Sequence, residues 1–152
     1  MSGFSVHINV EGLSALGGAE AALRGIRERA KDLSVPLRAG GFHMLRSIRE
    51  NFRAGGRPTR WKPLASATLK AKAPKTKLLV DTGRLMGSIT FRAERDELAV
   101  GSNVIYARIH QLGGRAGRGH ATTIPARPYL VFQKSDVEVI GRLVGEHLAG
   151  EA

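Results

Sequence analysis

Apolar and polar residues alternate at the beginning of the chain, over residues 4–10. A period of two predicts a strand with one buried face, and Glu11-Gly12 is expected to end it. The apolar members of this pattern are Phe4, Val6, Ile8 and Val10.

Two helical patterns follow this predicted strand. Apolar residues recur at spacings of three and four over residues 13–33, which predicts an amphipathic helix. Pro36 suits the first turn of a second helix, because a missing N–H costs little there, and the apolar stripe of this helix continues to Phe52. Three bases line a different face of the second helix: Arg46, Arg49 and Arg53.

The middle of the chain begins with an irregular segment. Two Pro and two Gly predict a loop over residues 54–63. A short helix over residues 66–72 and a basic linker over residues 73–77 are expected to follow it. The linker leads to a second short helix over residues 83–86, which either Asp81 or Thr82 is expected to cap.

Alternation returns after the second short helix. It predicts a β-hairpin with strands over residues 89–93 and 98–100. A helix over residues 104–112 is expected to end at Gly113-Gly114. A glycine-rich basic loop over residues 113–120 then leads to a short strand at 122–124.

The last part of the chain combines a stiff corner with a helix. Two prolines make residues 125–128 a rigid corner. Ser135 and Glu138 have the spacing of a capping box, which predicts the start of a C-terminal helix. Apolar residues lie on two sides of this helix, so we expect it to pack on two sides, one of them in a neighbouring subunit.

These elements predict a single α+β domain over residues 1–152. Its small antiparallel sheet would combine the N-terminal strand, the central hairpin and the short late strand. The sheet would pack with two long N-terminal helices and the C-terminal helix. Flexible arms are expected at about residues 54–77 and 113–121, because these segments lack the apolar periodicity needed to pack alone.

Charge changes this picture in the middle of the chain. The protein has 24 Lys and Arg against 13 Asp and Glu, and residues 38–118 contain 17 of the bases and five of the acids. This distribution predicts a basic face on a folded body, although a solvated surface without a ligand explains it equally well. The candidates for facing DNA or an acidic partner are Arg46, Arg49, Arg53, Arg57, Arg60, Lys62, Arg115 and Arg118.

Candidate catalytic chemistry is weak. The absence of cysteine excludes disulfides, thiolate zinc sites and a cysteine nucleophile. None of the five histidines has a second ligand at zinc spacing. His110 follows Tyr106 by four residues and is expected to stack beside it, in a structural role rather than a catalytic one. We therefore expect no enzyme, no metal and no cofactor.

The chain also lacks signals for membranes or secretion. No apolar run approaches the roughly 20 residues that span a bilayer. The first residues have no basic region followed by an apolar one, so a signal peptide is not expected. These observations predict a protein made in the cytoplasm.

Several short sequence phrases, beginning in the second half of the basic region, carry a family resemblance. They occupy residues 60–64 with 68–69, then 78–89, 100–102, 106–114 and 124–130. In this order and spacing they resemble the phage virion morphogenesis family, the tail-completion proteins of Mu-like and related tailed phages. The resemblance covers roughly residues 42–132.

This resemblance implies a structural virion protein without catalytic residues. It would complete the tail or join head to tail, as a terminator, stopper or connector in a homo-oligomeric ring, expected to contain six copies, around the DNA channel at the neck. Its partners would be neighbouring neck or tail proteins, with non-specific contact to packaged DNA. A sequence-independent nucleic-acid-binding protein remains the alternative function.

The phrases also supply candidate assembly positions. Gly83 is expected to allow close helix approach, and Gly113 to permit a turn. Arg127, between two prolines, is a candidate for an ion pair or a clamp on backbone carbonyls. The full set is Trp61, Leu79, Asp81, Gly83, Leu85, Ile89, Tyr106, His110, Gly113, Pro125, Arg127 and Pro128.

Overall fold

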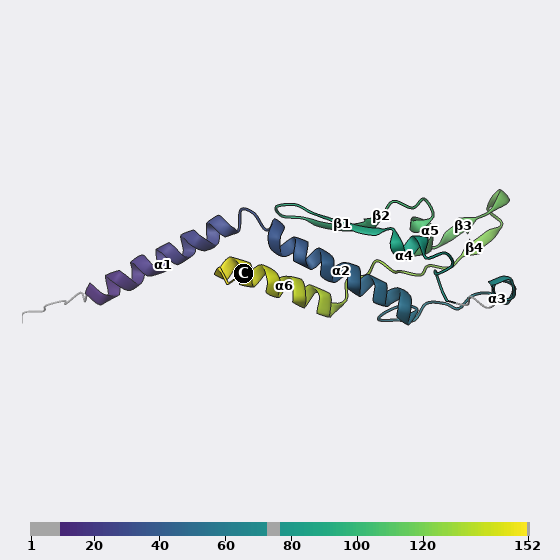
Figure 1. Cartoon of the computed structure of the whole chain (residues 1–152), viewed down its shortest axis with the longest axis horizontal. Coiled ribbons are helices and arrows are strands. Elements are labelled where there is room, and N and C mark those ends of the chain that lie inside the picture. The colour runs from purple at the N-terminus through teal and green to yellow at the C-terminus, as the bar shows by residue number, and fades with distance from the viewer. Residues whose placement is uncertain (1–9, 73–76, 152) are drawn as a thin grey trace, which may run out of the picture.

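The longest helices set the shape of the molecule in the computed structural model, which describes residues 10–72 and 77–151. Figure 1 shows helices α2 and α6 side by side, with a β-hairpin along α2 and helix α1 projecting from one end. The helices are α1 (Val10–Arg29), α2 (Ser34–Ala54), α3 (Ser66–Lys72), α4 (Arg84–Gly87), α5 (Ala107–Leu112) and α6 (Lys134–Ala149). The strands are β1 (Ile89–Ala93), β2 (Leu98–Ser102), β3 (Gly114–Ala116) and β4 (Thr122–Ile124), and a 3-10 turn, η1 (Arg118–His120), lies between the last two.

Helix α1 begins earlier than the sequence pattern predicted. The expected turn at Glu11-Gly12 lies inside α1, and Val10, assigned to the N-terminal strand, is helical. Residues 4–9 of that strand lie outside the described part of the chain. The Ala-rich sequence that follows favours helix, and no strand pairs with this segment within the described residues.

The sequence pattern correctly predicted that α1 is helical, but it predicted the wrong packing. The predicted amphipathic helix was expected to pack with the sheet, yet Leu23 and Ile26 on its apolar side are 66% and 40% exposed. Contacts with the body lie at the C-terminal end of the helix, where Arg29 Nε donates to the Leu148 carbonyl at 2.7 Å.

The α+β class is confirmed, but the strands form two separate hairpins rather than one sheet. β1 pairs antiparallel with β2, with Phe91 opposite Val100. β4 was expected to join this hairpin and pairs instead with β3, with Thr123 opposite Arg115. Gly117 and Gly119 have positive φ angles, which allow the chain to turn back locally at a small cost in closure entropy.

The core forms where one face of α2 meets the loops and the first hairpin. The α2 side chains Met44, Ile48 and Phe52 are at most 3% exposed. The Phe52 ring contacts Trp61 and Tyr129, with ring centroids 5.8 and 5.3 Å away. The residues that complete this cluster are Leu85, Ile89 and Ala107.

The beginning of the segment predicted as an arm at residues 54–77 packs against this core. Trp61 is only 7% exposed. Arg57 donates from Nε to Asn51 Oδ1 at 2.8 Å and from a terminal nitrogen to the Ser47 carbonyl at 2.6 Å. Single side chains, Arg57 and Trp61, anchor this segment. It therefore packs without a repeating apolar face, which is why apolar periodicity did not reveal the packing. Residues 114–120, in the second predicted arm, form β3 and η1.

The start of α6 has the predicted kind of cap, but different residues form it. Gln133 and Asp136 make the capping box, rather than Ser135 and Glu138. Asp136 is selected because its carboxylate also binds groups on α2, which the spacing in the sequence did not reveal. None of the helices in the described ranges is long and apolar enough to span a membrane.

Candidate functional site

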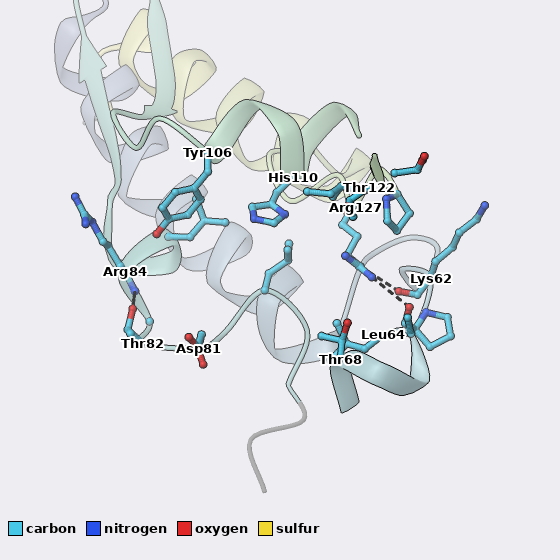
Figure 2. A pocket seen from close by; sticks show the side chains of 18 residues that line it. Lys62, Leu64, Thr68, Asp81, Thr82, Arg84, Tyr106, His110, Thr122 and Arg127 are labelled. Atoms are coloured by element: carbon cyan, nitrogen blue, oxygen red, sulfur yellow. Dashed lines mark hydrogen bonds between the residues drawn. The ribbon is translucent and has the colours of Figure 1, made fainter. Parts of the chain in front are cut away.

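A groove of about 970 Å³ opens at the end of the molecule that carries α3, α4, α5 and the second hairpin. Figure 2 shows Asp81, Thr82 and Arg84 on one side, and Lys62, Leu64 and Thr68 on the other. Tyr106 and His110 lie between these two sides. Most of the surface that lines the groove is apolar, which suits it to apolar groups of a partner.

Positions selected from the ordered phrases converge on this groove. Eight of the twelve line it: Leu79, Asp81, Gly83, Leu85, Tyr106, His110, Pro125 and Arg127. Trp61 and Ile89 lie in the adjoining core. The phrases therefore encode one three-dimensional feature, although they come from separate segments of the chain.

Arg127 joins two walls of the groove, as a clamp on backbone carbonyls. It is 6% exposed. Its Nε donates to the Lys62 carbonyl at 3.1 Å, and a terminal nitrogen donates to the Pro63 carbonyl at 3.2 Å (Figure 2). Burial lowers the pKa of Arg127, but a guanidinium stays charged at neutral pH. Of the two predicted roles, the structure confirms the carbonyl clamp.

Trp61 and Pro128 form a second link beneath the groove. The indole Nε1 donates to the Pro128 carbonyl at 2.8 Å, while the ring packs edge-on against Phe52. The rigid corner at residues 125–128 is thereby held against α2. Trp61 is a core residue, and its position between two bases in the sequence does not place it on an exposed basic surface.

Gln111 is a positioning residue that the sequence analysis did not select. Its Oε1 accepts hydrogen bonds from the backbone N–H groups of Tyr129 and Leu130, at 2.9 and 3.0 Å. Its Nε2 donates to the Leu130 carbonyl at 3.1 Å. The only signal in the sequence was its place in the phrase at residues 106–114. Gln111 therefore fixes α5 against the backbone at Tyr129 and Leu130.

His110 has the predicted contact with Tyr106, with ring centroids 5.8 Å apart and the rings nearly perpendicular. Its Nδ1 is buried and has no hydrogen-bond partner among the described residues. Burial, and then the charge of Arg127, lower the pKa of His110. At neutral pH this imidazole is therefore an uncharged part of the groove wall.

The two glycines among the candidate positions have different reasons to be glycine. Gly113 has φ of 73°, and a Cβ there would lie 2.7 Å from the Ala126 nitrogen, so the predicted turn is confirmed. A Cβ on Gly83 would meet nothing within 4 Å. The predicted close approach at Gly83 is therefore wrong, and its φ of 81° explains the residue instead.

Neither of the two predicted residues caps α4, because Gly83 is the N-cap and no side chain among the described residues makes a capping hydrogen bond. Thr82 Oγ1 accepts a hydrogen bond from the Arg84 backbone N–H at 3.3 Å. Asp81 is exposed and is the only acidic residue among those that line the groove in the described part of the chain. Asp81 therefore has no capping role, and its exposed carboxylate can face a partner.

The predicted basic residues separate into three groups. Arg57 is half-buried and belongs to the scaffold, so its assignment to an exposed basic face is wrong. Lys62 is exposed at the groove, near the exposed Arg60. The remaining members are exposed on two other elements: Arg46, Arg49 and Arg53 on α2, and Arg115 and Arg118 in the second hairpin.

The described residues contain no group of three side chains that could hold a metal ion. His110 stands beside a phenol and a guanidinium rather than beside a hydroxyl nucleophile. The chemistry that this arrangement supports is recognition of a partner through apolar surface and positive charge.

Comparison with known proteins agrees with this interpretation. The model of the phage virion morphogenesis family matches residues 15–149. Mu-like prophage FluMu G protein 2 of Haemophilus influenzae is 45% identical over 116 residues, which cover 76% of this chain and 78% of that protein. No solved structure matches the chain.

Proposed function

The chain belongs to the phage virion morphogenesis family, and from this premise we propose that it completes the tail or joins it to the head. The family is structural rather than enzymatic, and its members act in virion assembly. The finer proposal is a ring subunit at the neck, or head-proximal tail end, around the DNA channel. The proposed ring contains six copies.

The observation that carries this proposal is the convergence of the ordered phrases on one groove. A structural protein is expected to keep its characteristic residues where it contacts partners or holds a contact surface in shape. Here Arg127 and Trp61 hold the walls, while Tyr106 and Asp81 are exposed on the lining. This division supports a docking function better than a catalytic one.

The elongated shape supports assembly into a ring. The groove lies at one end of the molecule and α1 projects from the other (Figure 1). Contacts between two different surfaces of identical subunits build a closed ring when the rotation between neighbours returns to the first copy. Proteins of the neighbouring neck and tail rings would then contact the remaining faces.

A map of intact virions tests this proposal. We expect a closed ring of this chain between head and tail, and accumulation of unjoined heads and tails when the gene is inactivated. Complementation with the wild-type gene is the control. A single copy, an open array or a location at the distal end of the tail would contradict the neck-ring proposal.

Sequence-independent nucleic-acid binding is the second candidate function. Exposed arginines on α2 and in the second hairpin favour it, because diffuse positive charge binds phosphates without reading bases. A titration of the full chain with random-sequence duplex DNA at physiological salt tests it. Weak, strongly salt-dependent binding fits DNA passing through a channel, whereas tight binding by the free protein would favour the second function.

A further inference from the structure

Helix α1 carries an apolar surface without a partner in the described chain. Leu23 is 66% exposed and Ile26 is 40% exposed. Ala19 is four residues before Leu23 and is also exposed, so these three residues share one face of the helix. Helix α1, which carries this face, extends away from the body (Figure 1).

The groove is another apolar surface that the described chain leaves open. Three exposed apolar side chains belong to segments that also line the groove: Leu69 in α3, Ile105 before α5 and Leu112 in α5, which are 38%, 99% and 62% exposed. Clustered exposure of this kind marks interaction sites in natural proteins. The groove and α1 lie at opposite ends of the molecule (Figure 1), so one copy does not cover its own groove.

The groove and the first part of α1 carry opposite charges. Lys62 and Arg84 are exposed at the groove, and Asp81 is the only acidic residue among its described lining residues. Further exposed bases at this end are Arg60, Arg108, Arg115 and Arg118. Residues 10–23 have the opposite character, because they contain Glu11 and Glu20 but no Lys or Arg. The first base of the whole chain is Arg24.

We propose that the exposed apolar face of α1, formed by Ala19, Leu23 and Ile26, docks in the groove of a second copy of this chain. These three apolar side chains would enter the groove, and the exposed Glu20 would face its basic rim. The contact joins different surfaces of identical subunits, so each copy offers one helix and one groove. This inference rests on the proposed self-assembly and identifies the two surfaces that would mediate it.

Other occupants fit the observations less well. A DNA strand would bind the exposed Lys and Arg side chains through its phosphates, but it has no need of the apolar lining of the groove. Pairing of α1 with another α1 would bury the apolar face but would leave the groove empty. Docking of α1 in the groove covers the apolar face of the helix and the apolar lining of the groove, and it pairs opposite charges.

Disulfide trapping tests this contact directly, because the chain has no cysteine of its own. The probe is a mixture of two full-length variants, Leu23→Cys and Thr68→Cys, whose positions are exposed on α1 and at the groove. The matched control mixes Leu23→Cys with Ser135→Cys, which is exposed on α6 and outside the groove lining. Linked peptides are quantified by mass spectrometry at millimolar protein concentration.

We expect roughly tenfold more of the mixed disulfide with Thr68→Cys than with Ser135→Cys. Adding Glu20→Lys to the Leu23→Cys variant should lower this yield, whereas Glu28→Lys on the same helix should leave it unchanged. Equal yields at the two partner positions would overturn the proposal. A dominant disulfide between two copies of the Leu23→Cys variant would also overturn the proposal, in favour of pairing between α1 helices.

Failure of the proposed contact between α1 and the groove can be distinguished from failure of the neck-ring proposal. If virion maps show the ring but trapping finds no preference for the groove, the ring is held by other surfaces and the inference is wrong. If trapping succeeds but the chain is absent from the neck, self-association through α1 stands and the location is wrong.

Discussion

The Ser47 hydroxyl donates a hydrogen bond of 2.8 Å to the Asp136 carboxylate, across 89 residues of chain. The same carboxylate lies 2.8 Å from His43 Nε2 and accepts from the Gln133 backbone N–H at 2.9 Å. Asp136 is 2% exposed. One side chain therefore caps α6 and ties its first turn to α2, which positions the two longest helices of the body.

Replacing Asp136 with Ala should lower the free energy of unfolding by about 3 kcal/mol, because it removes the cap and leaves buried donors on Ser47 and Gln133 unpaired. Denaturant unfolding measures this loss. Glu138→Ala is the matched control, because Glu138 makes an exposed contact with Lys134 at 3.9 Å and should change stability by less than about 0.5 kcal/mol. Equal effects of the two substitutions would contradict the assigned role of Asp136.

Acidification should destabilise the fold through His110. Its pKa in the folded state is lowered by burial and by Arg127 from the ordinary value of 6.5. As pH falls through 6.5, the unfolded chain therefore binds a proton that the folded chain binds less readily, and unfolding becomes easier. Thermal unfolding between about pH 7.5 and 5.5 should show this decline, and His110→Gln should reduce it.

At lower pH a second group contributes to the loss of stability. Burial alone would raise the pKa of Asp136, but hydrogen bonds from Gln133, Ser47 and His43 lower it. The resulting stability is present above the ordinary value of 3.8 and disappears as pH falls through the lower folded-state pKa. His110→Gln should leave this loss of stability below the ordinary Asp pKa unchanged, which separates the contribution of Asp136 from that of His110.

Gly41→Ala should be destabilising where α2 crosses the first hairpin. A Cβ at Gly41 would overlap the ring carbons of Phe91, so the substitution should cost about 1–3 kcal/mol of stability through overpacking. Gly145→Ala on α6 is the control, because a Cβ there meets nothing within 4 Å. That substitution should stabilise the helix by about 0.5–1 kcal/mol. A stable Gly41→Ala protein would show that the contact between α2 and β1 is loose.

Arg127→Ala should loosen the groove as well as the fold. It leaves the Lys62 and Pro63 carbonyls without their buried donor, at a cost of about 2–3 kcal/mol. Hydrogen exchange should then increase at residues 60–65. The exposed Arg108 provides the control, and Arg108→Ala should change neither quantity. Unchanged protection in Arg127→Ala would mean that other contacts hold this wall.

Reversing Arg46, Arg49 and Arg53 together to Glu should impair infectivity without unfolding the protein. All three are exposed on α2, and Arg53 contacts only the partly exposed Glu50 at 3.6 Å among the described ion pairs. Plaque counts measure infectivity, and circular dichroism checks the fold. Fully infectious particles would exclude a role for these residues in DNA passage or docking. An unfolded protein would show that they belong to the scaffold.

The periodicity of the sequence was enough to predict most local elements. The helices that start near Pro36, at Ser66 and near residue 134, and the hairpin after Ser88, follow from apolar spacing and turn residues. These features depend on neighbours a few residues apart, so the sequence contains the relevant interactions. The order of the phrases also identified the family, because residues kept at fixed spacings remain readable without a structure.

Tertiary structure decided which of these elements meet. The exposed position of α1, the pairing of β4 with β3 and the choice of Asp136 as cap all depend on contacts between distant residues. The groove is the clearest case, because its lining comes from segments at residues 62–68, 79–85, 106–110 and 122–127. Spacing along the chain does not encode the distance between such segments. Long-range hydrogen bonds, such as those of Arg127 and Trp61, fix that distance only when the chain folds.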